Sequence, residues 1–573
     1  MKSVAAILLA LASAIPVAAD CAAQSIDWEV ADRFRLFTDP RHQNAYLNAR
    51  QTILKTKGYR PPLLQPKNDL SLGWAINWPT RWNESTEQYD RNWIHQRNRT
   101  IRIKLTGVPQ GAVCRWSLDA GTSCKERTLH TQVGVLTKIT VDVVRNGAIV
   151  KKLNTDIEPK DIFIMVMGDS VGSGEGNPHL SLRAGAGDND TVRYPAIWWD
   201  THCHRSLLSG PAQAAVVYAE RHPRQSVTFV SYACSGAEIN DGVLTTYQGR
   251  ETVNQIKQLL KDYGQEGNQI AALKGPNDTL KPAEHKLRSQ IDRAAEVLCP
   301  LGEAACVKKQ PDILIVAVGG NDIGFGEIGR TLLLSDPGPN VGEWRKKQQG
   351  DITPYFKKLS EDYSALAPVV RERIAPKSVL LMEYIDPSMY GQDKFCGRER
   401  TSFGKAAGKS KKDLDKNDPS GISTAINFSL YNLLVMREES RLAHWIVGGL
   451  NDRIRQAAAL TWTAGAPGGT ASVVPLQDMR GPDGLRRGLC ATNSWFIGIG
   501  ESLLRQGWIS SDPVHKFPLK LTDKNNCPYP LENDVCKAVA GNVTSGILHP
   551  NFFGHYNAAR QILLQMEAVL PKN

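Results

Sequence analysis

One unbroken apolar run ends abruptly at a serine. Six apolar residues extend from Ile162 to Met167, and Gly168-Asp-Ser170 follows directly. A run of this length predicts a strand buried on both faces of a sheet. Glycines and small residues follow, which let a ligand approach the backbone N–H groups. This pattern is typical of a serine nucleophile on a rigid strand, with a tight turn that contains an incidental serine as the alternative interpretation.

Strands and helices alternate along the chain after this run. We predict further strands at 226–232, 312–318, 378–385 and 471–476. We predict helices at 211–222, 287–298 and 355–374, and a last helix up to Leu570. Alternation of this kind predicts an α/β fold, in which helices cover both faces of a parallel sheet.

Polar and glycine-rich motifs follow the predicted strands at the points where they end. Gly168-Asp-Ser170, Ser235-Gly236 and Gly320-Asn321 each come directly after one strand. Ligands of such folds bind beyond the carboxyl ends of the strands, so the three motifs should meet in one crevice. His549, followed by Pro-Asn at the start of the last helix, is the fourth motif.

Serine-based ester hydrolysis needs a nucleophile, a base, a group that orients the base, and donors for the oxyanion. We assign Ser170 as the nucleophile and His549 as the base. The backbone N–H groups of Ser170 and Gly236 and the side-chain amide of Asn321 are the predicted oxyanion donors. We interpret Asp169 as structural and His555 as a packed helix residue.

The four motifs, in this order, resemble the sequence blocks of the GDSL or SGNH hydrolase family, including its secreted bacterial esterases and lipases. The resemblance covers residues 160–570 apart from 390–470. It implies a flavodoxin-like three-layer sheet and a carboxylic ester hydrolase without cofactor or metal. Family members usually carry Asp three residues before the histidine, where this chain has Gly546. We therefore predict a Ser170–His549 dyad in which the backbone carbonyl of Gly546 orients the imidazole.

Other functions remain open at this stage. Gly168-Asp-Ser170-Val-Gly172 also fits the nucleophile elbow of α/β-hydrolases, although Ser170 would then follow the first strand of its domain instead of a middle one. The same site would serve a carbohydrate O-acetylesterase or an acyltransferase. A catalytically inactive surface-binding relative is the non-enzymatic alternative. The motifs indicate ester chemistry and leave the acyl length and the alcohol undetermined.

The sequence also predicts a domain organisation. Residues 1–19 are typical of a secretory signal peptide, with Lys2 before an apolar run. Residues 24–98 are predicted to form an N-terminal extension and 99–158 a small Ig-like β-sandwich with short alternating strands and an Asn-Gly turn. The hydrolase domain is predicted at 159–573, with a lysine-rich insertion at about 390–470.

The cysteines indicate the compartment in which the protein works, and the net charge indicates the kinds of partner that it can bind. The chain has 11 cysteines, and export favours disulfides over metal ligands. The pairs that proximity along the chain suggests are Cys114–Cys124, Cys203–Cys234, Cys299–Cys306, Cys396–Cys490 and Cys527–Cys536. We expect a secreted or periplasmic monomer that acts on a small-molecule, lipid or glycan ester. The net charge of +11 is dispersed, which favours peripheral contact with a membrane or polysaccharide over nucleic-acid binding.

Overall fold

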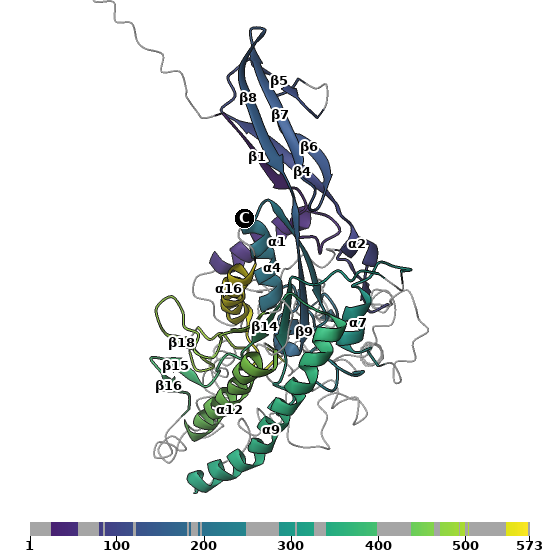
Figure 1. The fold of residues 1–573 in the computed structure, drawn as a ribbon. Coiled ribbons are helices and arrows are strands. Elements are labelled where there is room, and N and C mark those ends of the chain that lie inside the picture. The colour runs from purple at the N-terminus through teal and green to yellow at the C-terminus, as the bar shows by residue number, and fades with distance from the viewer. Residues whose placement is uncertain are drawn as a thin grey trace, which may run out of the picture. The chain divides into compact units, whose positions relative to one another are not determined.

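The structure of this chain is a computed structural model. It describes residues 24–55, 79–83, 86–118, 122–179, 183–184, 193–194, 198–247, 286–303, 306–325, 340–397, 437–462, 470–491, 493–498, 502 and 546–570. These residues form two compact units (Figure 1). The smaller unit contains residues up to Asp32 together with 97–160 and 223–225, and the larger unit contains the rest. The predicted signal peptide lies outside the described residues.

Two antiparallel three-stranded sheets form the smaller unit. One has the order β1 (Ser25–Val30), β4 (Asn98–Thr106), β6 (Arg127–Gln132), and the other has the order β5 (Val113–Trp116), β7 (Thr137–Arg145), β8 (Ala148–Ile157). Side chains from both sheets bury one apolar cluster. Its members alternate along the strands, because successive residues of a strand point to opposite faces.

This division differs from the predicted segments. The stretch 24–98, predicted to be one extension, is divided between the two units. Strand β1 pairs with β4 along its whole length, from Ser25 opposite Thr106 to Val30 opposite Ile101. Residues 33–96 belong instead to the larger unit, where Phe34 and Tyr46 join the main core.

A five-stranded sheet forms the centre of the larger unit. Its order is β12 (Gln225–Ser231), β9 (Lys160–Gly168), β13 (Ile313–Ala317), β14 (Ser378–Met382), β17 (Thr470–Val474). The pairs β9–β13, β13–β14 and β14–β17 are parallel. Numbered along the chain, this order is 2-1-3-4-5, which is that of flavodoxin-like sheets. The predicted α/β fold with a parallel sheet is thus confirmed.

Helices pack in two groups in this unit. Helices α4 (Gly210–Arg221) and α16 (Phe552–Val569) pack together, and α9 (Val341–Arg373) packs against α7 (Gln290–Glu296) and α12 (Arg437–Gln456). Figure 1 shows α4 beside α16 on one side of the sheet and α7 beside α9 on the other. Among the described residues, no helix has the length and apolar character needed to cross a bilayer.

Short elements complete the larger unit. They are α1 (Arg41–Lys55), β2 (Trp82–Asn83), β3 (Gln88–Tyr89), α2 (Arg91–His95), α3 (Ser170–Ser173), β10 (Arg183–Ala184), β11 (Arg193–Tyr194), β15 (Met389–Gly391), β16 (Lys394–Phe395), the π-helix Ala457–Trp462 and β18 (Arg486–Arg487). The lysine-rich stretch lies outside the described residues. Helix α12, predicted as part of an insertion, instead buries Leu442, Ile446 and Leu450 in the main core, so it is a structural layer of the fold.

Four of the predicted disulfides are present. The bonds join Cys114 to Cys124, Cys203 to Cys234, Cys299 to Cys306, and Cys396 to Cys490. Cys527 and Cys536 lie outside the described residues.

Candidate functional site

Ser170 is the first residue of α3, directly after the sharp turn that follows β9. Gly168 adopts a φ of +135°, and a Cβ atom there would lie 1.9 Å from the carbonyl oxygen of Ala317, so only glycine fits. Asp169 caps α3, because its Oδ1 accepts a hydrogen bond from the N–H of Val171 at 3.0 Å. The turn therefore fixes the backbone on both sides of Ser170.

His549 is held in a loop just before α16. The N–H of Ile497 donates to the carbonyl oxygen of His549 at 2.9 Å, and the N–H of Leu548 donates back to Ile497 at 3.1 Å. Asn551 then caps α16 by accepting hydrogen bonds from Phe553 and Gly554. These contacts place the imidazole at the edge of the sheet where Ser170 lies.

The two side chains meet directly. Nε2 of His549 lies 2.7 Å from Oγ of Ser170, although 379 positions separate the residues along the chain. A neutral imidazole that carries its proton on Nδ1 accepts from the serine hydroxyl through Nε2. Such a pair can move a proton from a hydroxyl group to a ring nitrogen.

The carbonyl that faces the other ring nitrogen belongs to a different residue from the one we predicted. Nδ1 of His549 lies 3.2 Å from the carbonyl oxygen of Ile547. The carbonyl of Gly546 instead accepts from the backbone N–H of His549 at 3.1 Å. Leu548 adopts a φ of +68°, and this turn directs the Ile547 carbonyl toward the ring. A main-chain oxygen, and not a carboxylate, thus faces Nδ1 of the ring.

Asn321 and Gly236 follow β13 and β12. Asn321 lines the same cavity as Ser170 and His549, and its Nδ2 donates to the carbonyl oxygen of Ala237 at 2.9 Å. Gly236 has a φ of +84°, and a Cβ there would lie 2.1 Å from the hydroxyl of Tyr247. Gly236 is not among the residues that line the cavity. The hydrogen bond from the Asn321 amide nevertheless fixes Ala237, the residue directly after Gly236.

The cavity beside Ser170 is mainly apolar. Its lining residues are Asp169, Ser170, Val171, Gly320, Asn321, Ile323, Phe325, Tyr384, Ile385, Pro387, Ile446, Val447, Leu450, Phe496, Leu548, His549 and Pro550. The polar groups of Ser170, Asn321 and His549 lie beside side chains from α12 and from the loops after β13 and β14. A cavity of this kind favours an apolar group next to the reacting atom.

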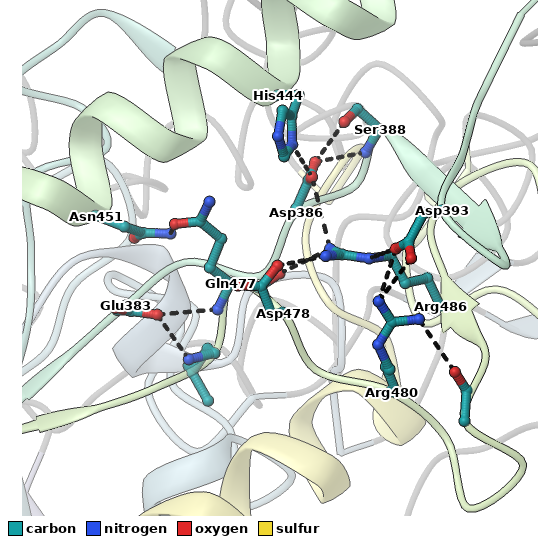
Figure 2. A network of polar contacts seen from close by, with 12 residues as sticks. Glu383, Asp386, Ser388, Asp393, His444, Asn451, Gln477, Asp478, Arg480 and Arg486 are labelled. Carbon is teal, nitrogen blue, oxygen red and sulfur yellow. Dashed lines mark hydrogen bonds and ion pairs between the residues drawn. The ribbon is translucent and has the colours of Figure 1, made fainter.

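Polar contacts hold α12 along the segment that follows β14. Asn451 Oδ1 accepts from the N–H of Tyr384 at 2.8 Å, and His444 Nδ1 lies 2.6 Å from Asp386. Figure 2 shows that Asp386 also accepts from Ser388 and lies close to Arg486. The hydrogen bond to Asp386 raises the pKa of His444. These contacts keep the α12 wall of the cavity in place.

Two buried carboxyl groups flank the site residues. Burial raises the pKa of Asp169 to about 7, and the hydroxyl of Tyr384 donates to this carboxyl group. Burial also raises the pKa of Asp322 to about 7. Asp322 Oδ1 accepts from the N–H of Ile239 at 2.9 Å. Both carboxyl groups therefore accept hydrogen bonds within the protein, which agrees with a structural role.

His555 and His204 are buried and make contacts within the protein, which agrees with a structural role. His555 is 1% exposed and its Nδ1 accepts from the N–H of Gly210 at 3.1 Å, while burial lowers the pKa of its imidazole to about 3. His204 Nδ1 lies 2.8 Å from the buried carboxylate of Glu175. In the described part of the chain, no group of three or more His, Cys, Asp or Glu side chains could hold a metal ion.

Sequence reasoning missed three residues that shape the site. Tyr384 and Asn177 contact the loops that carry predicted site residues, and Asn451 holds Tyr384. Tyr384 and Asn451 are polar residues inside or beside apolar stretches, a weak signal that many core residues share. Asn177 had the clearest signal of the three, because it lies in the glycine-rich segment after Ser170.

The fold and the site together define an α/β protein with a Ser–His pair at the carboxyl edge of a parallel sheet. No protein-family model and no curated protein matches the chain.

Similar solved structures include a lipase, a phospholipase and a putative lipase. An extracellular lipase from Streptomyces rimosus has 14% identity and a TM-score of 0.33, with 71% of this chain and 100% of that chain covered. Phospholipase A1 from Streptomyces albidoflavus has 13% identity and a TM-score of 0.32, with 71% and 99% covered. A putative GDSL-like lipase from Parabacteroides merdae has 11% identity and a TM-score of 0.23, with 72% and 96% covered. TM-scores this low carry no argument about the activity of this chain.

Proposed function

We propose that this protein is a carboxylic ester hydrolase of the GDSL or SGNH type that acts through an acyl-enzyme on Ser170. The observation that carries the proposal is the 2.7 Å contact between Ser170 Oγ and His549 Nε2, beside Asn321 in an apolar cavity. A hydroxyl, a base and a donor for the oxyanion are the groups that acyl transfer needs.

In the first step, the Oγ atom attacks the ester carbonyl carbon while its proton passes to Nε2 of His549. The carbonyl oxygen becomes an oxyanion, which the N–H groups of Ser170 and Gly236 and the amide of Asn321 stabilise as donors. The C–O bond to the alcohol then breaks, and His549 returns the proton to the leaving oxygen. The acyl group remains on Ser170 as an ester.

In the second step, water attacks the acyl-enzyme. His549 accepts a proton from this water through Nε2 and then returns it to Oγ when the acid leaves. The carbonyl oxygen of Ile547, 3.2 Å from Nδ1, keeps the imidazole in the tautomer that both steps require. A carbonyl dipole stabilises the imidazolium less than a carboxylate does, because it carries no net charge.

The apolar cavity supports an ester whose acyl group or alcohol is apolar next to the reacting carbonyl. An acyltransferase would share the first step and would replace water with an alcohol acceptor. A carbohydrate O-acetylesterase would also share it, with an acetyl group in the cavity. The chain length of the preferred ester therefore separates the O-acetylesterase from a lipase-type esterase, and transfer to an alcohol acceptor separates the acyltransferase from both hydrolases.

We further propose that the protein is exported and that its smaller unit is a β-sandwich with a structural role. The four disulfides in the described part of the protein support an oxidising compartment. The shared core of the two small sheets supports the sandwich.

The test combines covalent labelling with turnover. A fluorophosphonate probe should label the wild-type chain at Ser170, and the chain should hydrolyse p-nitrophenyl esters. The variants Ser170→Ala and His549→Ala should each lower kcat by at least about a thousandfold, as losses in Ser–His machinery do. Ser364→Ala, which removes a hydroxyl on the exposed face of α9, is the control and should act like wild type.

Turnover that survives in Ser170→Ala would refute the proposal. A labelled protein that hydrolyses nothing but transfers acyl groups to an added alcohol would instead support the acyltransferase. Absence of both labelling and turnover would support an inactive binding protein.

A further inference from the structure

Tyr384 lies between the two segments that carry Ser170 and Asn321. It follows β14, at the edge of the sheet where the site lies, and its ring lines the cavity. The residue is 9% exposed. Neither its type nor its position along the chain marked it as part of the predicted chemistry.

The hydroxyl group of Tyr384 makes two hydrogen bonds. It donates to Oδ2 of Asp169, the residue before Ser170. It accepts from the backbone N–H of Gly320, the residue before Asn321, at 2.9 Å. One oxygen atom thus joins the segment of the proposed nucleophile to the segment of a proposed oxyanion donor.

The main chain of Tyr384 is fixed as firmly as its hydroxyl group. The side chain of Asn451, fully buried on α12, accepts from the N–H of Tyr384 at 2.8 Å and donates to its carbonyl oxygen at 2.9 Å. A Cβ atom on Gly320 would lie 3.0 Å from the tyrosine ring, so the glycine loop packs tightly against it. The ring therefore has little freedom to move.

We propose that Tyr384 is a positioning residue that sets the placement of Asn321 relative to Ser170, and that Asn451 holds Tyr384 in that role. The inference rests on the proposed esterase function. Oxyanion donors act only when they lie at hydrogen-bond distance from the oxygen of the transition state, not of the ground state. A tyrosine that fixes this distance affects the chemical step more than it affects substrate binding.

The first test compares two tyrosine variants that each lose one buried hydroxyl group. Tyr384→Phe removes the bridge between Asp169 and Gly320. Tyr46→Phe is the matched control, because the hydroxyl of Tyr46 donates to the carbonyl oxygen of Leu207 at 2.8 Å and Tyr46 is 0% exposed. Tyr384→Phe should lower kcat for p-nitrophenyl esters about 10- to 100-fold, with KM changed less than threefold. Tyr46→Phe should leave both constants within about twofold of wild type.

A second variant distinguishes loss of the contact between Tyr384 and Asp169 from general loosening of the core as the cause of a lower kcat. Asp169→Asn keeps an acceptor for the α3 cap, since Asn caps helices well, but weakens the contact with Tyr384. If the two residues act through one contact, the double variant Asp169→Asn/Tyr384→Phe should lose no more kcat than the worse single variant. Multiplied losses would overturn the proposal, and thermal unfolding of each variant shows whether it is folded.

The outcomes distinguish this inference from the proposed function. If Ser170→Ala abolishes turnover but Tyr384→Phe behaves like Tyr46→Phe, only the role of Tyr384 is refuted. If Ser170→Ala retains turnover, the esterase proposal itself fails. Should Tyr384→Phe not fold, the kcat of Asp169→Asn decides, because a wild-type value there would refute the bridge.

Discussion

Asn177 donates a hydrogen bond from Nδ2 to the main-chain oxygen of Pro550 at 2.8 Å, across 373 positions of the chain. Asn177 belongs to the glycine-rich segment after Ser170, and Pro550 directly follows His549. The contact therefore joins the loop of the proposed nucleophile to the loop of the proposed base.

Removal of this contact should weaken both activity and stability. Asn177→Ala leaves the buried carbonyl of Pro550 without this donor, which costs about 1–3 kcal/mol of unfolding free energy. A small displacement of His549 should also lower kcat about 10- to 100-fold. Asn177→Asp should be worse, because its carboxylate would face the carbonyl oxygen. Urea unfolding and p-nitrophenyl ester kinetics check both effects.

Asn557→Ala is the matched control for this prediction. Asn557 also donates to a backbone carbonyl, that of Phe553 at 2.9 Å, but this contact lies within α16. Equal losses of kcat in the Asn177 and Asn557 variants would show that the contact with Pro550 has no special role.

The disulfide Cys203–Cys234 should stabilise the loop that carries Gly236. The N–H of Ser235 donates to the carbonyl oxygen of Cys203 at 3.1 Å, directly beside the bond. The double variant Cys203→Ser/Cys234→Ser should lose about 2–4 kcal/mol of stability. Its kcat should also fall, because the loop of a proposed oxyanion donor becomes looser.

Removal of the Cys114–Cys124 bond is the comparison, because this disulfide belongs to the smaller unit. The double variant Cys114→Ser/Cys124→Ser should lower the stability of that unit and leave kcat near the wild-type value. A loss of kcat that is as large as in the Cys203/Cys234 variant would contradict a specific role of the loop. Thermal unfolding and ester kinetics in the same buffer give both readouts.

Asp322 should make the stability of the protein depend on pH. Burial raises the pKa of Asp322 to about 7 in the folded chain, against 3.8 as the ordinary value. The folded state thus binds the proton more tightly, so this contribution to stability is complete below about pH 4 and is lost as the pH rises toward 7. At most about 4 kcal/mol is lost in this window, since one pKa unit corresponds to about 1.4 kcal/mol.

Asp322→Asn should remove this part of the pH dependence. Its amide oxygen can still accept from Ile239, and any cost of the amide group is the same at every pH. Urea unfolding between pH 4 and 8 should therefore show the variant gaining stability relative to wild type as the pH rises. Parallel curves for the two proteins would refute the effect of Asp322.

The sequence predicted the parts of the site that depend on strand ends and short motifs. Ser170, Asn321 and His549 meet as expected, because apolar runs identify the strands and parallel strands end at one edge. The carbonyl beside His549 was predicted wrongly. Its direction depends on the positive φ of Leu548, and leucine gives no sign of that conformation.

The sequence did not predict the long-range polar contacts of the site. The hydrogen bond between Tyr384 and Gly320 and the hydrogen bond between Asn451 and Tyr384 depend on where α12 packs. Neither tyrosine nor asparagine is a residue type specific for such a role. Helix α12 was interpreted as part of an insertion because it follows a lysine-rich stretch that interrupts the alternation of strands and helices. Its packing on the core shows that a helix that follows an interruption in the pattern can still belong to the core of the fold.

The α12 wall should determine which acyl chains the site accepts. Val447 lines the cavity and is 3% exposed, so a larger side chain there has to take space from the substrate. Val447→Phe should lower kcat/KM for octanoyl esters about tenfold or more relative to acetyl esters, since each methylene in an apolar pocket is worth about 1–3 kcal/mol. Leu442→Phe is the control, because Leu442 lies on the same helix in the core but does not line the cavity. It should destabilise the protein without altering the ratio of the two esters. An unchanged ratio in a folded Val447→Phe variant would mean that the acyl group lies elsewhere.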